Sequence, residues 1–264
     1  MHYLIKAGIR VCVESALQIK QSQGLQRGKN DKIDARRIAS YAFKNQKDLR
    51  LWKPQRSVIQ KLKELLTVRE RLVRVRVQLQ KPIKENDVFM EKSIKNVITG
   101  LYDRTLRSIS ADIVKVENAI DGLLKEDQKL AEQFKCASSV PGVGKIIALN
   151  VIVATGEFEM ISDIKKFACY AGVAPFEHSS GSSIRGKTRV SKMANMSMKT
   201  LLHLGARSAI TCCDELKTYY HRKVNAGKNK MSVLNAVSNK LISRIFVCVK
   251  NQRIYEKNYQ RALA

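Results

Sequence analysis

Two aspartates three residues apart stand in a basic stretch near the N-terminus, residues 29–37. On a helix, Asp31 and Asp34 would share one face within a single turn. Two carboxylates in that position can hold a hard cation such as Mg²⁺, and the flanking Lys and Arg side chains can hold the phosphates on which the metal acts. The same spacing is typical of a helix start, where Asp31 complements the helix dipole as the N-cap or in the first turn. Spacing alone leaves both interpretations open.

A pair of serines, Ser179 and Ser180, stands directly before Gly181 in a polar stretch of the C-terminal half. A serine hydroxyl becomes a nucleophile when a base takes its proton or its surroundings lower its proton affinity, and His178 is adjacent. Four basic residues that can hold a phosphate and stabilise its transition-state charge follow: Arg185, Lys187, Arg189 and Lys192. No Ser/His/Asp triad can be assembled from the spacing, and a Ser-rich stretch beside a glycine is most often a flexible turn.

A Pro-Gly-Val-Gly turn, residues 141–144, leads into an apolar helical run that begins at Lys145. Glycines at positions Gly142 and Gly144 allow backbone N–H groups and a helix N-terminus to approach a phosphate. The pattern therefore favours a helix–hairpin–helix that binds nucleic acid, with Lys145 beside it. A plain turn between two packed helices fits the same residues equally well.

The formal net charge of the 264-residue chain is +26, from 49 Lys and Arg against 23 Asp and Glu. Half of this excess lies in residues 177–264, which hold 17 Lys and Arg against 4 Asp and Glu. A charge so far from zero indicates a polyanionic partner, and DNA or RNA is the first choice. An anionic membrane surface is a weaker choice, because it would favour one basic amphipathic helix with bulky aromatic residues.

The six cysteines form no Cys-x-x-Cys pair and no zinc-binding spacing. The sequence has no run of about 18 apolar residues, and its start does not resemble a signal peptide. These features are typical of a reduced, cytoplasmic protein with buried thiols, and the charge adds an expected association with the nucleoid. The prediction is a chain that binds nucleic acid and no membrane.

Residues 1–53 form the first of three regions that must position these residues. This region predicts a helix end at Gly8, an alternating strand over residues 9–13, and a helix that carries the two aspartates. A lone strand is not stable without partners. We therefore interpret the region as the remnant of an α/β domain that lacks the N-terminal part of its sheet.

Residues 54–136 have apolar residues at helical spacing, with Pro82 among them. The pattern predicts two long helices, the first interrupted or kinked by Pro82, arranged as an antiparallel coiled-coil hairpin or paired between subunits. An ordinary helical bundle is the alternative. In each case the region is a spacer or a dimerisation element without catalytic chemistry.

Residues 137–264 predict a helical C-terminal domain. The turn at 141–144 opens it, a short helix ends at Gly172, and a loop over residues 177–183 runs into the basic stretch 185–192. Helices resume near Asn195 and continue over residues 201–209 and 233–249. The expected fold is thus mainly α.

Three separate motifs occur in an order that is characteristic of one family: residues 29–35, the turn 141–144, and residues 170–175 followed by Ser179-Ser180-Gly181. With the long helical spacer and residues 190–195, they extend over nearly the whole chain. The chain resembles the DEDD-type insertion-sequence transposases of the Piv-invertase-related group, the bridge-RNA-guided recombinases. Each motif is short, and the specificity comes from their combination.

The resemblance implies a RuvC-like domain of the RNase H type, in which four acidic residues bind Mg²⁺, and a coiled-coil spacer through which the chain forms homo-oligomers. The last two acids correspond to Asp31 and Asp34. The nucleophilic serine of the C-terminal domain corresponds to Ser180, with Ser179 as the alternative. Serine attack on a DNA phosphodiester gives a phosphoserine intermediate, metal-bound carboxylates of a partner subunit assist, and a structured guide RNA selects the DNA sites.

The chain departs from the family pattern in two places. The first Asp of the four and the Glu have no counterpart, and two carboxylates alone are a poor Mg²⁺ site because hard cations need more oxygen ligands and more charge. We therefore expect an N-terminally truncated chain that is inactive, or nearly so, by itself. The second departure is Ala194, which stands before Asn195 in place of the usual glycine. The alternative function is a non-catalytic DNA- or RNA-binding protein.

Overall fold

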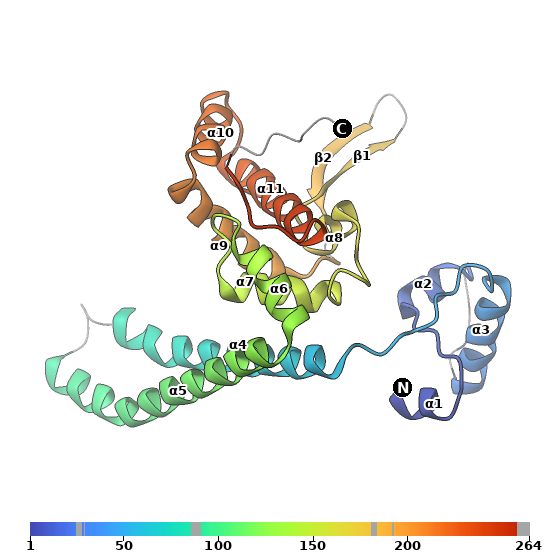
Figure 1. Ribbon diagram of the computed structural model, residues 1–264, viewed down its shortest axis with the longest axis horizontal. Coiled ribbons are helices and arrows are strands. Elements are labelled where there is room, and N and C mark those ends of the chain that lie inside the picture. The colour runs from blue at the N-terminus through green and yellow to red at the C-terminus, as the bar shows by residue number, and fades with distance from the viewer. Residues whose placement is uncertain (25–27, 29, 86–90, 181–183, 192, 258–264) are drawn as a thin grey trace. The chain divides into compact units, whose positions relative to one another are not determined.

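The computed structural model describes residues 1–24, 28, 30–85, 91–180, 184–191 and 193–257. Within these residues the chain forms eleven helices and one two-stranded sheet, which confirms the prediction of a mainly helical fold. The chain divides into two compact units, Met1–Arg56 (unit 1) and Ser57–Ala264 (unit 2) (Figure 1).

The described part of unit 1 contains three short to medium helices: α1 (His2–Lys6), α2 (Ala16–Gln21) and α3 (Asp31–Lys44). The predicted strand over residues 9–13 is wrong. That segment makes a single antiparallel bridge, between Cys12 and Leu51. Alternating β-branched residues form a strand only where a partner supplies a ladder of hydrogen bonds, and the described residues of unit 1 supply one bridge.

Unit 1 buries little apolar surface. Among its described residues Tyr41 is the one buried hydrophobic side chain, and its hydroxyl accepts a hydrogen bond from Gln18 Nε2 at 2.9 Å. By contrast, Tyr3 is 81% exposed and Phe43 is 76% exposed. Because apolar burial is the main source of folding free energy, the contacts within this unit stabilise it only weakly.

Unit 2 begins with two long helices, α4 (Ser57–Glu85) and α5 (Lys92–Glu126), which lie side by side (Figure 1). This confirms the prediction of a helical pair. Arg69 Nε donates a hydrogen bond to Glu117 Oε1 at 2.7 Å and links the two helices. Pro82 lies inside α4, so the expected interruption is wrong. The helix continues past this proline to Glu85.

The base of the helical pair shares a small core with α6 (Gln128–Ser138) and α7 (Lys145–Thr155). α7 is apolar on every side because it lies between two cores. Leu149 and Ile152 belong to the small core, whereas Ile147, Ala148 and Val151 belong to a larger one. α6 also belongs to both, with Leu130 in the small core and Cys136 and Ala137 in the larger one, so α6 and α7 together connect the long helices to the rest of unit 2.

The larger core is built by α6, α7, α8 (Ile164–Tyr170), α9 (Met196–Cys212), α10 (Asp214–Asn225) and α11 (Lys230–Lys250). The helices predicted to end near Gly172 and to start near Asn195 are confirmed, and so is the one over residues 233–249. Among the described helices, α11 alone is long and apolar enough to cross a membrane by length and composition. Ten of its residues are buried within the core.

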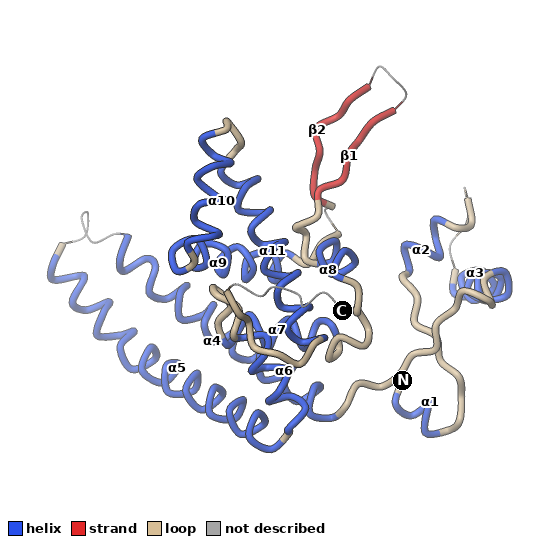
Figure 2. The backbone as a smooth tube through the Cα atoms, turned by 45° about the horizontal axis from the view of Figure 1, so that its top comes forward, coloured by secondary structure: helices blue, strands red, loops and turns tan. Residues whose placement is uncertain are grey.

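The sheet is an antiparallel hairpin of β1 (Pro175–Ser180) and β2 (Ile184–Val190) (Figure 2). The prediction of a loop over residues 177–183 is therefore wrong for residues 177–180, and residues 181–183 lie outside the described part of the structure. Phe176, Ile184, Thr188 and Val190 all favour a pleated strand, and a partner strand lies within a few residues of them. The glycine and serine content of the segment concealed this preference.

Candidate functional site

The two aspartates lie in the first turn of α3. Asn30 is the N-cap residue, and its Oδ1 accepts a hydrogen bond from the Ile33 N–H at 2.8 Å. Asp31 is exposed, whereas Asp34 Oδ1 pairs with Arg37 Nη1 at 3.1 Å. Both carboxylates complement the helix dipole, so the sequence pattern marks a helix start, with Asn30 rather than Asp31 as its cap.

The two serines are the last residues of β1, at the end of the hairpin away from its base. The strand register pairs Ser179 with Arg185 and Ser180 with Ile184. The side chains of Ser179, Ser180, Arg185 and Lys187 lie outside the described part of the structure, and so do residues Gly181 and Lys192. The backbone therefore places the serines opposite the first residues of the basic strand.

The hairpin register is shifted by one residue between Phe176 and His178, so Arg189 stands opposite Phe176. Residues of a strand alternate between its two faces, and a bulge reverses the alternation in the strand that holds the extra residue. By register, Ser179 and Arg185 occupy positions on one face, whereas Ser180 and Arg189 occupy positions on the other. Each serine position thus shares a face with one arginine position.

The base of the hairpin is fixed between α8 and α9. Gly172 has φ +66°, and a Cβ at this position would lie 2.7 Å from the Ala194 Cβ. The Asn195 N–H donates to the Tyr170 carbonyl at 2.8 Å, and Asn195 Nδ2 donates to the Tyr170 hydroxyl at 2.8 Å. Asn195 Oδ1 also caps α9 by accepting from the Met198 N–H. The motif over residues 170–175 therefore holds the hairpin in place.

The Pro-Gly-Val-Gly turn joins α6 to α7, and its two glycines have different surroundings. Gly142 has φ +87° and packs against α9, where a Cβ would lie 2.5 Å from the Gly205 carbonyl oxygen and 2.6 Å from the Ala209 Cβ. Gly144 is the exposed N-cap of α7, with no atom within 4 Å of an added Cβ. Lys145 Nζ pairs with Asp121 Oδ1 at 2.6 Å. Gly142 thus permits close packing, and Gly144 leaves the start of α7 accessible.

The predicted site residues fall into three places. The hairpin base adjoins the start of α9 at Asn195, and the turn adjoins the same helix ten residues later at Gly205. At 1.5 Å per residue, these points on α9 are about 15 Å apart. The acidic pair belongs to unit 1. The fold therefore groups the serines with arginines and keeps the glycine turn separate from them.

Two family models match this chain. Residues 1–86 match the transposase model of the DEDD type, and residues 135–221 match the model described as the transposase IS116/IS110/IS902 family. Together the matches cover about two thirds of the sequence. The chain belongs to the IS110/IS116 family of transposases. This confirms the family resemblance drawn from the motifs.

The transposase is also similar to characterised relatives over most of its length. It is 26% identical to the pilin gene-inverting protein of Moraxella bovis over 260 residues, which are 97% of this chain and 77% of that protein. It is 27% identical to the transposase for insertion sequence element IS1111A of Coxiella burnetii over 203 residues, which are 69% of this chain and 55% of that protein.

The DEDD family implies a divalent metal, and the described residues do not complete a site for one. They contain no group of three or more His, Cys, Asp or Glu side chains that could hold a metal ion. Asp34 is already paired with Arg37, and a neighbouring guanidinium charge opposes the binding of a cation. The two aspartates of the transposase therefore provide, at most, part of a metal site.

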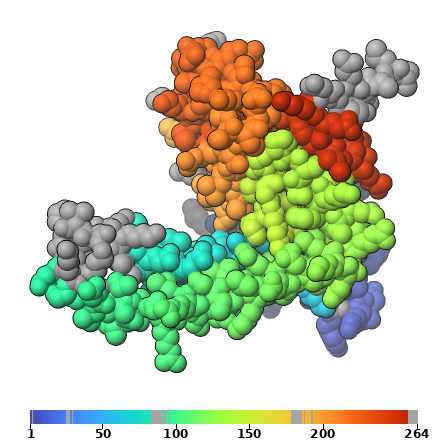
Figure 3. All heavy atoms as spheres, turned by 60° about the vertical axis from the view of Figure 1, so that its left-hand side comes forward, coloured from blue at the N-terminus to red at the C-terminus, as the bar shows by residue number. Residues whose placement is uncertain are grey.

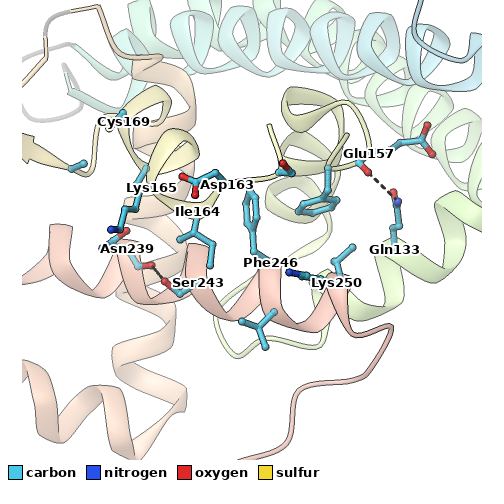
Figure 4. A pocket seen from close by; sticks show the side chains of 16 residues that line it. Gln133, Glu157, Asp163, Ile164, Lys165, Cys169, Asn239, Ser243, Phe246 and Lys250 are labelled. Atoms are coloured by element: carbon cyan, nitrogen blue, oxygen red, sulfur yellow. Dashed lines mark hydrogen bonds between the residues drawn. The ribbon is translucent and has the colours of Figure 1, made fainter. Parts of the chain in front are cut away.

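A cavity of about 980 Å³ lies between α8, α11 and the segment after α7 (Figure 4). Glu157 and Phe158 in its wall have positive φ angles, and Thr155 Oγ1 accepts a hydrogen bond from the Phe158 N–H at 3.1 Å. Gln133 Nε2 donates to the Glu157 carbonyl at 3.4 Å, while Gln133 Oε1 is buried without a partner in the described part of the chain. No sequence pattern indicated this cavity, because its residues come from distant segments.

Two cysteines of the transposase adjoin the larger core. Burial raises the pKa of the Cys136 thiol and the pKa of the Cys248 thiol above the ordinary value for cysteine. A nucleophilic cysteine needs the opposite, a lowered pKa that produces thiolate at neutral pH. The expectation of buried thiols is confirmed for Cys136, Cys213 and Cys248, whereas it is wrong for Cys12 and Cys212, which are exposed.

Proposed function

We propose that this transposase cuts and rejoins DNA at the ends of an insertion sequence, with Ser180 as the attacking nucleophile. The observation that supports this most is the place of Ser180 at the end of β1, in a hairpin whose second strand carries Arg185, Lys187 and Arg189. The family match and the net charge of +26 support DNA as the partner.

In the proposed step, the Ser180 hydroxyl oxygen forms a bond to phosphorus and the bond from phosphorus to one deoxyribose oxygen breaks. The hydroxyl proton passes to a general base, and the departing deoxyribose oxygen takes up a proton. The phosphate remains on the serine as an ester. Attack by a deoxyribose hydroxyl of another strand reverses the step and joins new ends. Arginines of the hairpin stabilise the charge of the transition state.

Asp31 and Asp34 are proposed as two of the Mg²⁺ ligands of a RuvC-like domain to which unit 1 belongs. The small core of unit 1 and its single bridge support its interpretation as one part of a larger α/β domain. Because two carboxylates do not complete a Mg²⁺ site, further acidic ligands must come from outside this pair.

The glycine turn is proposed to bind a phosphate of the nucleic acid, and a structured guide RNA is proposed to select the DNA sites. Gly144 and Lys145 lie at the accessible start of α7, where free backbone N–H groups favour a phosphate. This supports a helix–hairpin–helix role for residues 141–145. Selection of the DNA sites by a guide RNA is proposed from the family resemblance, and a location at the nucleoid would follow from DNA binding.

The long helices are proposed to pair with a second copy of the chain as a coiled coil. Apolar side chains far from the small core remain exposed there, among them Val77 at 50%, Val97 at 63% and Leu101 at 73%. Exposed apolar stripes of this kind mark interaction surfaces.

We expect Leu101→Lys to shift the chain towards the monomer by at least about tenfold in dissociation constant, because a buried lysine at the helix contact costs more than 1.4 kcal/mol. Sedimentation equilibrium measures the change. Asn96→Lys is the control, since it adds the same charge at an exposed polar position of α5. A wild-type chain that is monomeric at tens of micromolar would contradict the pairing.

One observation favours a second function, nucleic-acid binding without cleavage. The described residues complete no metal site, and Asp34 is paired with Arg37. Binding of phosphates by the Lys and Arg side chains of the chain does not require a metal. Formation of a covalent protein–DNA adduct separates the two functions, because only nucleophilic attack leaves DNA attached to the protein.

Both functions require DNA binding that weakens steeply with salt. Each phosphate neutralised by Lys or Arg contributes about −0.9 to the slope of log affinity against log salt, so several contacts give a slope of about −4 or steeper. Fluorescence anisotropy with a labelled 30-base-pair duplex between 50 and 300 mM NaCl measures this slope. A slope near zero would rule out phosphate-dominated binding.

A further inference from the structure

Helix α10 presents a face that the motifs did not indicate. It packs against α9 and α11, with Leu216 as its buried residue, and its outer surface stands free at the top of unit 2 in Figure 3. The exposed side chains of this outward face share one property, which is that each can donate hydrogen bonds: Lys217, Thr218, His221, Arg222 and Asn225.

The surrounding segment contains no carboxylate over forty residues. Residues 216–255 hold nine Lys and Arg and no Asp or Glu. A solvated protein surface normally carries positive and negative side chains side by side. A surface with positive charges alone is destabilised by their mutual repulsion unless a polyanion binds to it. The preceding acids are already paired, Asp214 with Lys257 at 3.2 Å and Glu215 with Arg244 at 2.6 Å. No acid of α10 therefore offsets its outward face.

The cations of this face are not neutralised, and one of them, Arg222, lies over an aromatic ring. Lys217 and Arg222 form no ion pair within the described ranges. The Tyr219 ring lies 5.8 Å from the Arg222 guanidinium carbon and 4.7 Å from Lys240 Nζ. Such contacts with an aromatic ring orient a cation while leaving its N–H groups free for phosphate oxygens.

The turn from α10 to α11 extends the cationic face. Lys228 and Lys230 are both exposed and flank Asn229, whose Oδ1 caps α11 by accepting from the Met231 N–H at 2.9 Å. The cap fixes the turn, so the two lysines are carried on a defined backbone rather than on a free loop. The α11 N-terminus adds the positive end of a 21-residue helix.

We propose that the outward face of α10 and the α10–α11 turn form a docking surface for duplex DNA, with Lys217, Arg222 and Lys228 on backbone phosphates. This rests on the proposed function, because it takes DNA as the partner. The family match ends at residue 221, so the whole turn between α10 and α11 lies beyond it. A free helix about 18 Å long suits the wide major groove of B-form DNA, whereas the deep, narrow groove of A-form RNA excludes a helix.

The test compares two double variants of the full chain. Lys217→Ala with Arg222→Ala removes two proposed phosphate contacts, and alanine keeps the helix because its helix propensity is higher. Lys61→Ala with Arg71→Ala is the matched control, since it removes one lysine and one arginine that are exposed on α4. Salt titrations use a labelled 30-base-pair duplex and an RNA hairpin with a long stem, and circular dichroism checks helix content.

For the α10 variant on duplex DNA, we expect the salt slope to become shallower by about 1.8, and for the control by less than about 0.5. An unchanged slope in the α10 variant, or an equal change in the control, would overturn the α10 surface. An equal change on the RNA hairpin would overturn its assignment to duplex DNA. A flat slope for the wild-type chain would instead overturn the proposed DNA binding itself.

Discussion

Replacement of Ser180 by alanine is expected to abolish cleavage of DNA by the transposase while leaving DNA binding within about twofold. The nucleophile forms the only covalent bond between protein and substrate, so its removal should lower the rate of strand cleavage by at least about 10³-fold. Binding is carried by phosphate contacts elsewhere on the chain. The result would assign to Ser180 a role in the reaction and not in recognition.

The measurement is an SDS-resistant adduct between the protein and end-labelled DNA, in the presence of Mg²⁺ and guide RNA. The substitution is made in this chain and at the position aligned with Ser180 in the pilin gene-inverting protein of Moraxella bovis, so that the outcome does not depend on whether the metal site of this chain is complete. Ser179→Ala is the matched control and should keep the adduct. Loss in Ser179→Ala with retention in Ser180→Ala would move the nucleophile to the position opposite Arg185.

Gly142→Ala is expected to destabilise unit 2 by about 3 kcal/mol or more. The φ of +87° is costly for any residue with a Cβ. The added methyl would lie 2.5 Å from the Gly205 carbonyl oxygen and 2.8 Å from the Ala209 backbone nitrogen. Neither backbone atom can rotate away as a side chain would, so the turn must separate from α9. Such a loss is a large part of the stability of a typical domain.

Urea unfolding followed by circular dichroism at 222 nm measures this loss. Gly122→Ala provides a control of opposite sign, because no atom lies within 4 Å of an added Cβ at this helical position of α5. It should stabilise the protein by about 0.5–1 kcal/mol through helix propensity. A Gly142→Ala variant as stable as the wild type would show that the turn can leave α9 without cost.

The elements that could be predicted from the sequence are those with local signals. α8 and α9 carry their own boundaries, a glycine after one and the capping residue Asn195 before the other. α11 repeats its apolar residues with helical spacing over its whole length. Signals of this kind do not depend on what the element packs against, so a single sequence is sufficient.

The elements that were missed depend on partners elsewhere. Residues 9–13 have strand character but find one bridge, whereas residues 184–190 form a strand because β1 lies beside them. α10 buries only Leu216, so its apolar periodicity was too weak to indicate a helix. The cationic face of α10 has a different signal in the sequence, which is the absence of carboxylates for forty residues after Glu215. A search for apolar spacing does not detect it.

The candidate site was predictable in its residue types but not in its arrangement. The sequence placed Ser179 and Ser180 in a loop, and only the strand register separates their positions onto different faces. The role of Gly142 in packing against α9 depends on Gly205, sixty-three residues later, and no local pattern links the two. Charge pairing of Asp34 by Arg37 is local, and helical spacing alone could have indicated it.

α7 contributes side chains to two cores at once, and this has a mechanical consequence. A load applied to the far end of the long helices reaches their base at Leu62 and Ile120, passes to Leu149 and Ile152, and enters the larger core through Val151 on the same helix. A force on the long helices would therefore reach the larger core through α7 and through α6, which also has residues in both cores. Tension between two paired copies of the chain would therefore be transmitted to the helices that carry the serine hairpin.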